Sequence, residues 1–178
     1  MIPVNRRDLA QAIFRVSHLT GTFQLRSGRT ATEYFDKYRF EADPALLRAI
    51  AAEAADLVPA GTDVLAGLGL GGVPIATALG LATGLPVAFV RKAAKSYGTR
   101  RLAEGAEIEG RRVLVVEDVI TSGGQVAIST TDLRGRGAVV DHVLCVVDRE
   151  EGGAEKLAAV GLTVTALFTA TELRTAEL

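Results

Sequence analysis

The chain has 178 residues, which is enough for one well-buried α/β domain and too few for two domains of ordinary size. Its 20 basic and 21 acidic side chains nearly cancel and form no charged tail, so the bulk charge gives no reason to expect a nucleic-acid partner. The single cysteine excludes a disulfide within the chain, and the two histidines lack companions at metal-ligand spacing, which argues against a zinc site.

The N-terminal part is predicted to contain a helix and a pair of strands. Residues 7–19 place their apolar side chains on one face, which is typical of an amphipathic helix. Two short strands, at 22–26 and 34–40, are expected around a turn at 27–29. Residues 1–7 lack the apolar core of a signal peptide, so we expect a cytoplasmic protein.

Strands and helices alternate over the rest of the chain. Asp43 is a good N-cap and Pro44 suits the first helical position, which predicts a helix that ends near Leu57. The later predicted elements, in chain order, are 64–66, 74–82, 87–90, 113–118, 124–135, 138–147, 154–160 and 163–168. Such alternation predicts an α/β fold with a mostly parallel twisted sheet flanked by helices.

One long uncharged stretch, 64–90, could cross a bilayer by its length alone. Its glycines and prolines divide it into a strand, a loop, a helix and a second strand, each too short to span a membrane. No membrane span is therefore expected. Cys145 lies in an apolar run and is interpreted as a buried small side chain.

The segment 113–124 carries the strongest functional signal. Its apolar run suits a strand buried on both faces, and Glu117 and Asp118 fall at the carboxyl end, where open α/β sheets bind ligands. Two carboxylates can accept hydrogen bonds from vicinal hydroxyls, while the small-residue turn 121–125 can direct backbone N–H groups at a phosphate. A diol and a phosphate together describe a ribose 5-phosphate.

A second glycine-rich segment, 67–72, fits the pattern G-x-G-x-x-G between a strand and a helix. The acid that a dinucleotide site requires further along is missing, and Arg91 and Lys92 stand there instead. These cations could suit NADP, so a small NADP-dependent reductase stays open as an alternative. We prefer a loop whose backbone N–H groups bind pyrophosphate.

These motifs resemble those of a known family. Residues 115–124, Val-Val-Glu-Asp-Val-Ile-Thr-Ser-Gly-Gly, resemble the phosphoribosylpyrophosphate (PRPP) motif of type I phosphoribosyltransferases, and residues 89–99 resemble the loop signature of the orotate phosphoribosyltransferase family. Similarity runs over nearly the whole chain and includes 25–29 and 147–149. The resemblance implies a single phosphoribosyltransferase domain over 1–178, with a small N-terminal hood at about 20–40 and a mobile catalytic loop at about 93–106.

The resemblance also implies an activity and its residues. The chain would transfer the 5-phosphoribosyl group of PRPP to N1 of orotate, with Lys95, Asp118 and Glu117 as catalytic residues. PRPP binding would involve Gly71, Gly72, Arg91, Lys92, Lys95, Tyr97, Glu117, Asp118, Val119, Ile120, Thr121, Ser122, Gly123, Gly124 and Gln125. Orotate binding would involve Arg26, Tyr34, Phe35, Thr121 and Arg149.

Four positions depart from the family pattern. Gly71 and Gly72 stand where many members have tyrosine and lysine, Tyr97 replaces a common histidine, and Arg26 replaces a common lysine. Side-chain contributions from the glycine loop, and any imidazole chemistry at position 97, therefore do not carry over.

The resemblance further implies Mg²⁺ as cofactor, held mainly by PRPP and water, and a homodimer in which basic loop residues reach the neighbouring subunit. Two alternatives remain beside the reductase: a phosphoribosyltransferase for another base, and a PRPP-sensing regulator. The regulator would need a nucleic-acid surface, for which the balanced charge gives no support.

Overall fold

A central sheet of six strands organises the molecule in the computed structural model, which describes residues 5–94, 96 and 102–177. The strand order is β5-β4-β3-β6-β7-β8, and every pairing is parallel except that of β5 with β4. The strands are β3 (Val64–Leu68), β4 (Val87–Val90), β5 (Ala103–Gly105), β6 (Arg112–Ile120), β7 (Val139–Asp148) and β8 (Thr163–Thr169). The predicted mostly parallel α/β sheet is confirmed.

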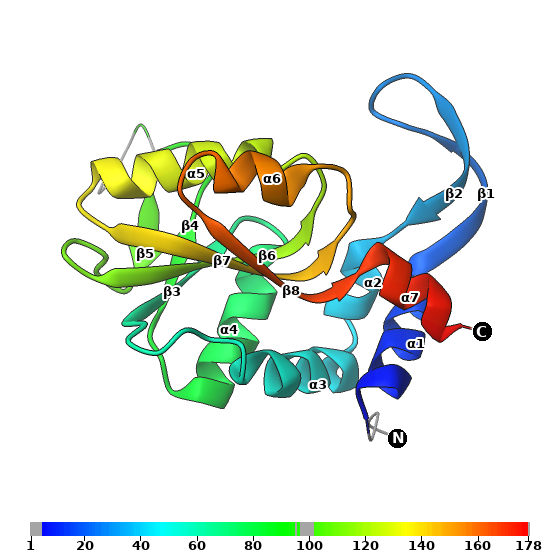
Figure 1. Cartoon of the computed structure of the whole chain (residues 1–178), viewed down its shortest axis with the longest axis horizontal. Helices are drawn as coiled ribbons and strands as arrows, with labels where there is room; N and C mark the ends of the chain where they lie inside the picture. The colour runs from blue at the N-terminus through cyan, green and yellow to red at the C-terminus, as the bar shows by residue number, and fades with distance from the viewer. Residues whose placement is uncertain (1–4, 95, 97–101, 178) are drawn as a thin grey trace.

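Helices cover both faces of this sheet (Figure 1). α5 (Gly124–Gly135) and α6 (Gly153–Ala158) lie on one face, and α3 (Pro44–Ala55) and α4 (Gly72–Thr83) lie on the other. Alternate side chains of β6 enter separate cores, with Val113 and Val115 toward α5 and α6. Leu114 and Val116 join the core on the side of α3 and α4.

The predicted helix after Asp43 is confirmed, with a slightly earlier end. Asp43 Oδ1 accepts hydrogen bonds from the backbone N–H groups of Ala45 at 2.9 Å and Leu46 at 3.2 Å. Pro44 occupies the first turn, where its missing N–H costs nothing. The uncharged stretch 64–90 divides into β3, α4 and β4 as predicted, and no helix in the described ranges has the length and apolarity to cross a membrane.

The N-terminal segment differs from the prediction in its second strand. α1 (Arg6–Ser17) leads into β1 (His18–Gln24) and β2 (Thr30–Phe35), an antiparallel hairpin that projects from the body (Figure 1). The strand expected at 34–40 is wrong, because α2 (Lys37–Glu41) begins just after β2. Asp36 causes the change: its side chain caps the helix by accepting the Tyr38 N–H at 3.2 Å.

The segment after β4 also contains an element that the sequence pattern did not predict. β5 pairs antiparallel with β4 at the edge of the sheet and overlaps the loop expected at 93–106. A strand of three residues is too short to show a period in the sequence.

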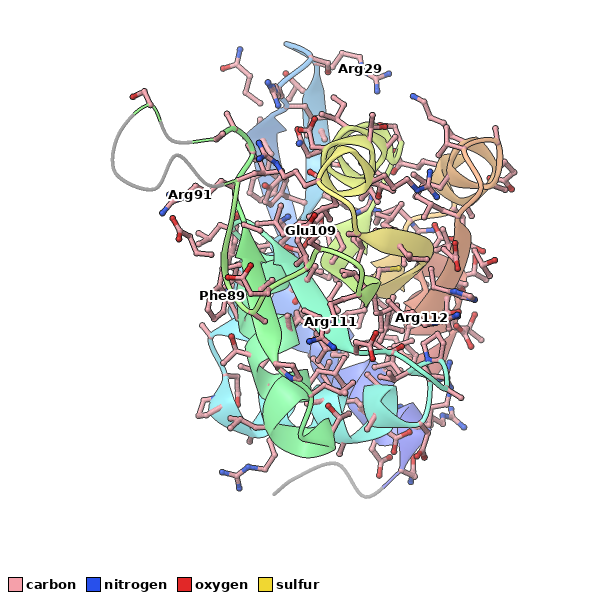
Figure 2. All side chains as sticks on the ribbon, turned by 90° about the vertical axis from the view of Figure 1, so that its left-hand side faces the viewer. Arg29, Phe89, Arg91, Glu109, Arg111 and Arg112 are labelled. Atoms are coloured by element: carbon pink, nitrogen blue, oxygen red, sulfur yellow. The ribbon has the colours of Figure 1, made fainter. Side chains whose placement is uncertain are left out.

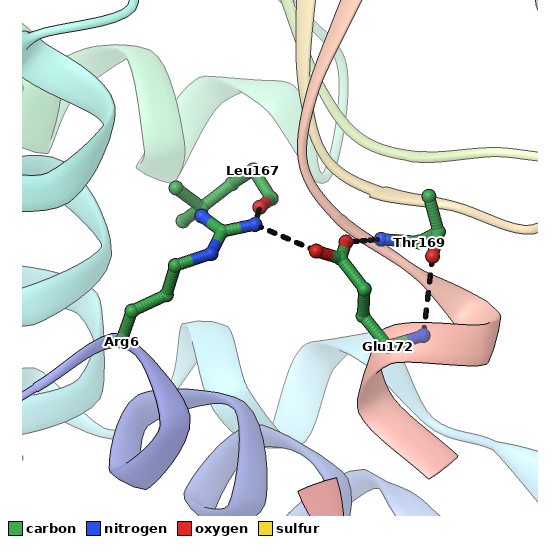
Figure 3. A network of polar contacts seen from close by, with 4 residues as sticks. All are labelled: Arg6, Leu167, Thr169 and Glu172. Atoms are coloured by element: carbon green, nitrogen blue, oxygen red, sulfur yellow. Dashed lines mark hydrogen bonds and ion pairs between the residues drawn. The ribbon is translucent and has the colours of Figure 1, made fainter. Parts of the chain in front are cut away.

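The last helix, α7 (Ala170–Ala176), was missed by the sequence analysis and packs against α1. Thr169 and Glu172 form a capping box, in which Thr169 Oγ1 accepts the Glu172 N–H and Glu172 accepts the Thr169 N–H. Glu172 also pairs with Arg6 of α1 at 3.1 Å, and Arg6 donates to the Leu167 carbonyl (Figure 3). The two ends of the described chain are thereby joined.

Candidate functional site

The candidate site lies at the carboxyl ends of β3 and β6, two adjacent parallel strands in the middle of the sheet. The chain leaves β3 toward α4 on one face and leaves β6 toward α5 on the other (Figure 1). Connections that diverge in this way open a crevice at the strand ends, where α/β proteins bind their ligands.

The loop after β3 is packed so closely that two of its positions require glycine. A Cβ atom at Gly71 would lie 1.6 Å from Asp118 Oδ2, and one at Gly72 would lie 2.4 Å from the Val116 carbonyl oxygen. This packing explains why tyrosine and lysine are absent from these positions. The N-terminus of α4 has no side-chain cap, and the Val73 N–H is bonded to the Leu70 carbonyl at 3.1 Å, so an anion could approach the remaining N–H groups of the first turn.

The loop after β6 also leads into a helix whose N-terminus lacks a side-chain cap. Gly123 has φ 73° at the N-cap of α5, a left-handed conformation that favours glycine, and it supplies no side-chain cap. Thr121, Ser122 and Gln125 are exposed around this helix N-terminus. Gly153 of α6 packs beneath the turn, because a Cβ there would lie 2.5 Å from the Thr121 carbonyl oxygen. The turn is therefore fixed in shape, with its amides open to a phosphate.

The two acids at the end of β6 lie against each other but differ in exposure. Glu117 remains partly exposed, and its Oε1 accepts the Asp118 N–H at 3.1 Å. Asp118 follows the face of Val116 and has no exposed surface. Its Oδ1 accepts the Val119 N–H at 2.6 Å, and its Oδ2 lies 2.7 Å from Lys37 Nζ. In this conformation, Glu117 is the acid that a ligand in the crevice can reach.

Lys37 and Glu41 were not predicted as site residues, because the sequence suggested a strand at 34–40. In α2 they lie one helical turn apart, and both side chains approach Asp118. A correct assignment of the Asp36 cap was the signal that could have found them.

Burial and close contacts within this group of one lysine and three acids shift the pKa values of its members. Burial, followed by the contact with Asp118, raises the pKa of Glu41 to about 9. Burial and the charge of Asp118 raise the pKa of Glu117 to about 8. Burial opposes the charge on Asp118, but contacts with Glu41 and Lys37 outweigh it and hold the Asp118 pKa below its usual value. The group therefore contains one ion pair, Lys37 with Asp118, beside two glutamates whose pKa shifts favour the neutral form.

The raised pKa of Glu41 predicts that stability falls as the pH rises. A glutamate with pKa 4.5 when unfolded and about 9 when folded contributes stability that is complete below pH 4.5 and lost as the pH passes 9. Glu41→Gln keeps the shape of the protonated acid. We expect it to unfold at higher urea concentration than wild type at pH 9, by roughly 1–3 kcal/mol, and equally at pH 5. Glu53→Gln, an exposed change on α3, is the matched control. Parallel pH curves for Glu41→Gln and wild type would contradict the assignment.

Three of the predicted base-binding residues meet around a small cavity. Tyr34, Phe35 and Arg149 line a space of about 70 Å³ between the hairpin, the end of β7 and the two terminal helices. Arg149 lies with its guanidinium carbon 5.8 Å from the centre of the Phe35 ring. Sequence analysis missed three charged or titratable residues of the wall: His18, Glu33 and Arg174.

Two other residues predicted to bind the base lie away from this cavity. Arg26 is exposed in the turn of the hairpin beyond β1, and Thr121 belongs to the turn between β6 and α5. Neither contributes to the cavity wall.

The predicted basic cluster is only partly described. Arg91 and Lys92 are exposed just beyond β4, and Arg91 Nε lies 4.0 Å from Glu104 Oε1. Figure 2 shows Arg91 and Phe89 on the β4 edge of the sheet. Lys95 and Tyr97 lie outside the described residues.

Cys145 is buried in β7, and burial raises the pKa of its thiol, as expected for a small core side chain.

Comparison with known proteins places this geometry in a family. Residues 38–169 match the family described as "Phosphoribosyl transferase domain". An orotate phosphoribosyltransferase of Nocardioides sp. is 56% identical over 169 residues, which are 95% of this chain and 94% of that protein. One from Methanocella arvoryzae is 46% identical over 153 residues, 86% of this chain and 87% of the relative.

A solved structure agrees with these sequences. The orotate phosphoribosyltransferase of Mycobacterium tuberculosis H37Rv in complex with PRPP has a TM-score of 0.82 and 32% identity, covering 95% of this chain and 98% of that chain. An adenine phosphoribosyltransferase from Thermoanaerobacter pseudethanolicus, at 18% identity and a TM-score of 0.69, shows the same fold. The fold alone thus does not choose the base.

Proposed function

Because the chain belongs to the orotate phosphoribosyltransferase family, we propose that it transfers the 5-phosphoribosyl group of PRPP to N1 of orotate. The products are orotidine 5′-monophosphate and pyrophosphate, a step of UMP biosynthesis. The observation that carries the proposal is the partly exposed Glu117 between two helix N-termini without side-chain caps. The family match gives no support to the NADP-reductase alternative.

Each part of PRPP has a matching surface in the crevice. The amides of 121–125 would bind the 5-phosphate, aided by the positive end of the α5 dipole. Glu117 would accept hydrogen bonds from the ribose hydroxyls, and Asp118 lies directly behind it. The amides around Gly71 and Gly72, with Arg91 and Lys92, would bind the pyrophosphate. Lys95 and Tyr97 belong to this proposal through the sequence motif.

Orotate would enter the cavity of Tyr34, Phe35 and Arg149. The aromatic rings offer stacking surfaces to the flat pyrimidine, and Arg149 offers a bidentate partner for its carboxylate. Bond breaking between ribose C1 and pyrophosphate leaves positive charge at C1, which nearby carboxylates stabilise. The electron pair leaves with pyrophosphate while N1 of orotate forms the new bond and releases its proton.

Magnesium is part of the proposal as an ion that arrives with PRPP. The described ranges contain no group of three or more His, Cys, Asp or Glu able to hold a metal ion. Mg²⁺ does not require such a group, because it keeps several waters and needs only one or two protein carboxylates beside phosphate oxygens. Glu117 is the acid that would face it, and the positive charge of the ion would favour the ionised form of Glu117. When bound, the ion supplies neutralisation of the pyrophosphate charge.

The direct test follows orotate absorbance with PRPP and Mg²⁺ present. We expect orotate to be consumed, with stoichiometric pyrophosphate release, while uracil, adenine and hypoxanthine react at least about a hundredfold more slowly. Equal turnover of another base would contradict orotate as the specific substrate. No turnover of any base would refute the assignment of the chain as an enzyme.

A cytoplasmic location is part of the same proposal, because its highly charged substrates do not diffuse across a bilayer. Fractionation of cells without detergent should leave the activity in the supernatant. Activity that sediments with membranes would contradict this location.

We also propose a homodimer formed through the face beside β4 and α4. Leu70 and Leu81 are 69% and 85% exposed there, and Tyr38 and Phe89 are exposed beside a shallow groove. Clustered apolar surface of this kind marks a protein interface. Leu81→Glu should raise the dimer dissociation constant by about tenfold or more in light scattering. Ile128→Glu, an equally radical change on the opposite face at α5, should leave the dimer intact. Equal behaviour of both variants would contradict this interface.

A further inference from the structure

α2 connects the base-binding hairpin to the PRPP crevice. It begins two residues after Phe35, and its five residues carry Lys37 and Glu41 on the side that faces β6. Lys37 Nζ lies 2.7 Å from Asp118 Oδ2, within the range of a short charge-assisted hydrogen bond. Lys37 is half-buried, whereas Asp118 has no exposed surface, so this pair is well removed from solvent.

Asp118 is held on three sides in this arrangement. The Val119 N–H binds Oδ1 at 2.6 Å, Lys37 binds Oδ2, and the backbone of Gly71 leaves no room for even one added carbon beside that oxygen. The carboxylate therefore forms a common contact for α2, β6 and the pyrophosphate loop. A displaced Asp118 side chain would move directly against that loop.

We propose that Lys37 is a positioning residue for PRPP, which holds Asp118 as a carboxylate so that α2 and the pyrophosphate loop dock together at Gly71. The inference rests on the proposed phosphoribosyl transfer and adds a residue outside the PRPP motif to its machinery. It also makes α2 the physical link between the surface for orotate and the surface for PRPP.

The acidic groups around Asp118 make its ionised form depend on a single lysine. Glu41 of α2 and Glu117 of its own strand both face it, the neighbouring β7 contributes the buried thiol of Cys145, and Gly71 contributes no side chain. Within the described residues, Lys37 is the cation that pairs with this group. Its removal would leave three acids together in a buried place, and Asp118 would take up a proton or turn away.

The test compares Lys37→Met with Lys37→Arg in the full-length protein, by steady-state kinetics at varied PRPP and pH. Lys37→Met should lower kcat/KM for PRPP by about 10–100-fold, and the acid limb of its pH profile should move up by about one pH unit. Lys37→Arg keeps the charge and should restore the limb and most of the rate. KM for orotate should change by less than about threefold in both variants.

Two outcomes would overturn the inference: a Lys37→Met profile that superimposes on wild type, or a Lys37→Arg variant no better than Lys37→Met. If Lys37→Met does not fold, Lys37→Gln removes the charge but keeps a donor, and should show the same shift of the limb. Glu53→Gln on the exposed side of α3 is the matched control, and its kcat/KM should stay within about twofold of wild type.

These results separate the inference from the function on which it rests. A wild-type protein that consumes no orotate refutes the proposed function. An active wild type whose rate and pH profile do not respond to Lys37→Met refutes the role of Lys37 alone.

Discussion

Gly72→Ala is expected to destabilise the protein by about 2–3 kcal/mol and to abolish most of the activity. The added Cβ would lie 2.4 Å from the Val116 carbonyl oxygen, far inside the contact distance of the two atoms. β6 cannot move away, because β3 and β7 hold it from both sides. α4 must shift instead, and its N-terminus would carry the pyrophosphate loop out of place.

Urea unfolding followed by circular dichroism measures the stability, and kcat/KM for PRPP measures the site. Gly135→Ala is the matched control, since it changes a glycine within α5 whose Cβ would meet no atom within 4 Å. That variant should be neutral or more stable than wild type by up to about 1 kcal/mol. Equal unfolding midpoints for the two variants would show that the close contact at Gly72 does not constrain the fold.

Arg149→Met should reduce kcat/KM for orotate by about 100–1,000-fold while leaving PRPP binding nearly unchanged. Arg149 is placed by its own backbone, whose N–H donates to the Ile120 carbonyl at 2.9 Å, and its Nη2 lies 3.6 Å from Glu151. The guanidinium therefore stands at the wall of the cavity before any ligand arrives. A methionine keeps much of the side-chain length but lacks the planar guanidinium that can donate two hydrogen bonds to a carboxylate.

The same variant should lose its preference for orotate over uracil, which lacks the carboxylate. The measurement is the ratio of the two kcat/KM values, and Arg48→Met on the exposed side of α3 is the control. A ratio unchanged from wild type would move carboxylate recognition to another residue of the wall, such as Arg174 or His18.

The parts of the fold that the sequence predicted are those with strong local signals. The apolar run at 113–116, the Asp43-Pro44 cap and the interruptions within 64–90 each describe their own structure. The short elements were missed for a physical reason. β5 depends on pairing with β4, and α7 depends on packing against α1, so neither is encoded by its own period.

The site was predicted in the same uneven way. Glycine-rich turns at strand ends were recognisable because backbone geometry demands those residues. The complete burial of Asp118 and the lysine that reaches it depend on the tertiary packing of α2. The mistaken strand at 34–40 concealed the roles of Lys37 and of Glu41 just after it. A strand there gives no reason to expect either side chain near β6, whereas the helix α2 brings both to Asp118.

The contact between α1 and α7 has a consequence for how the enzyme is made. Phe14 of α1 and Leu173 of α7 both line the cavity proposed for the base, although almost the whole chain separates them. During translation the first helix emerges early and can pack against α2 and α3, but its contact with α7 forms only when the last helix follows. A ribosome-bound nascent chain that stops before α7 should therefore possess its phosphate turns yet fail to retain a pyrimidine.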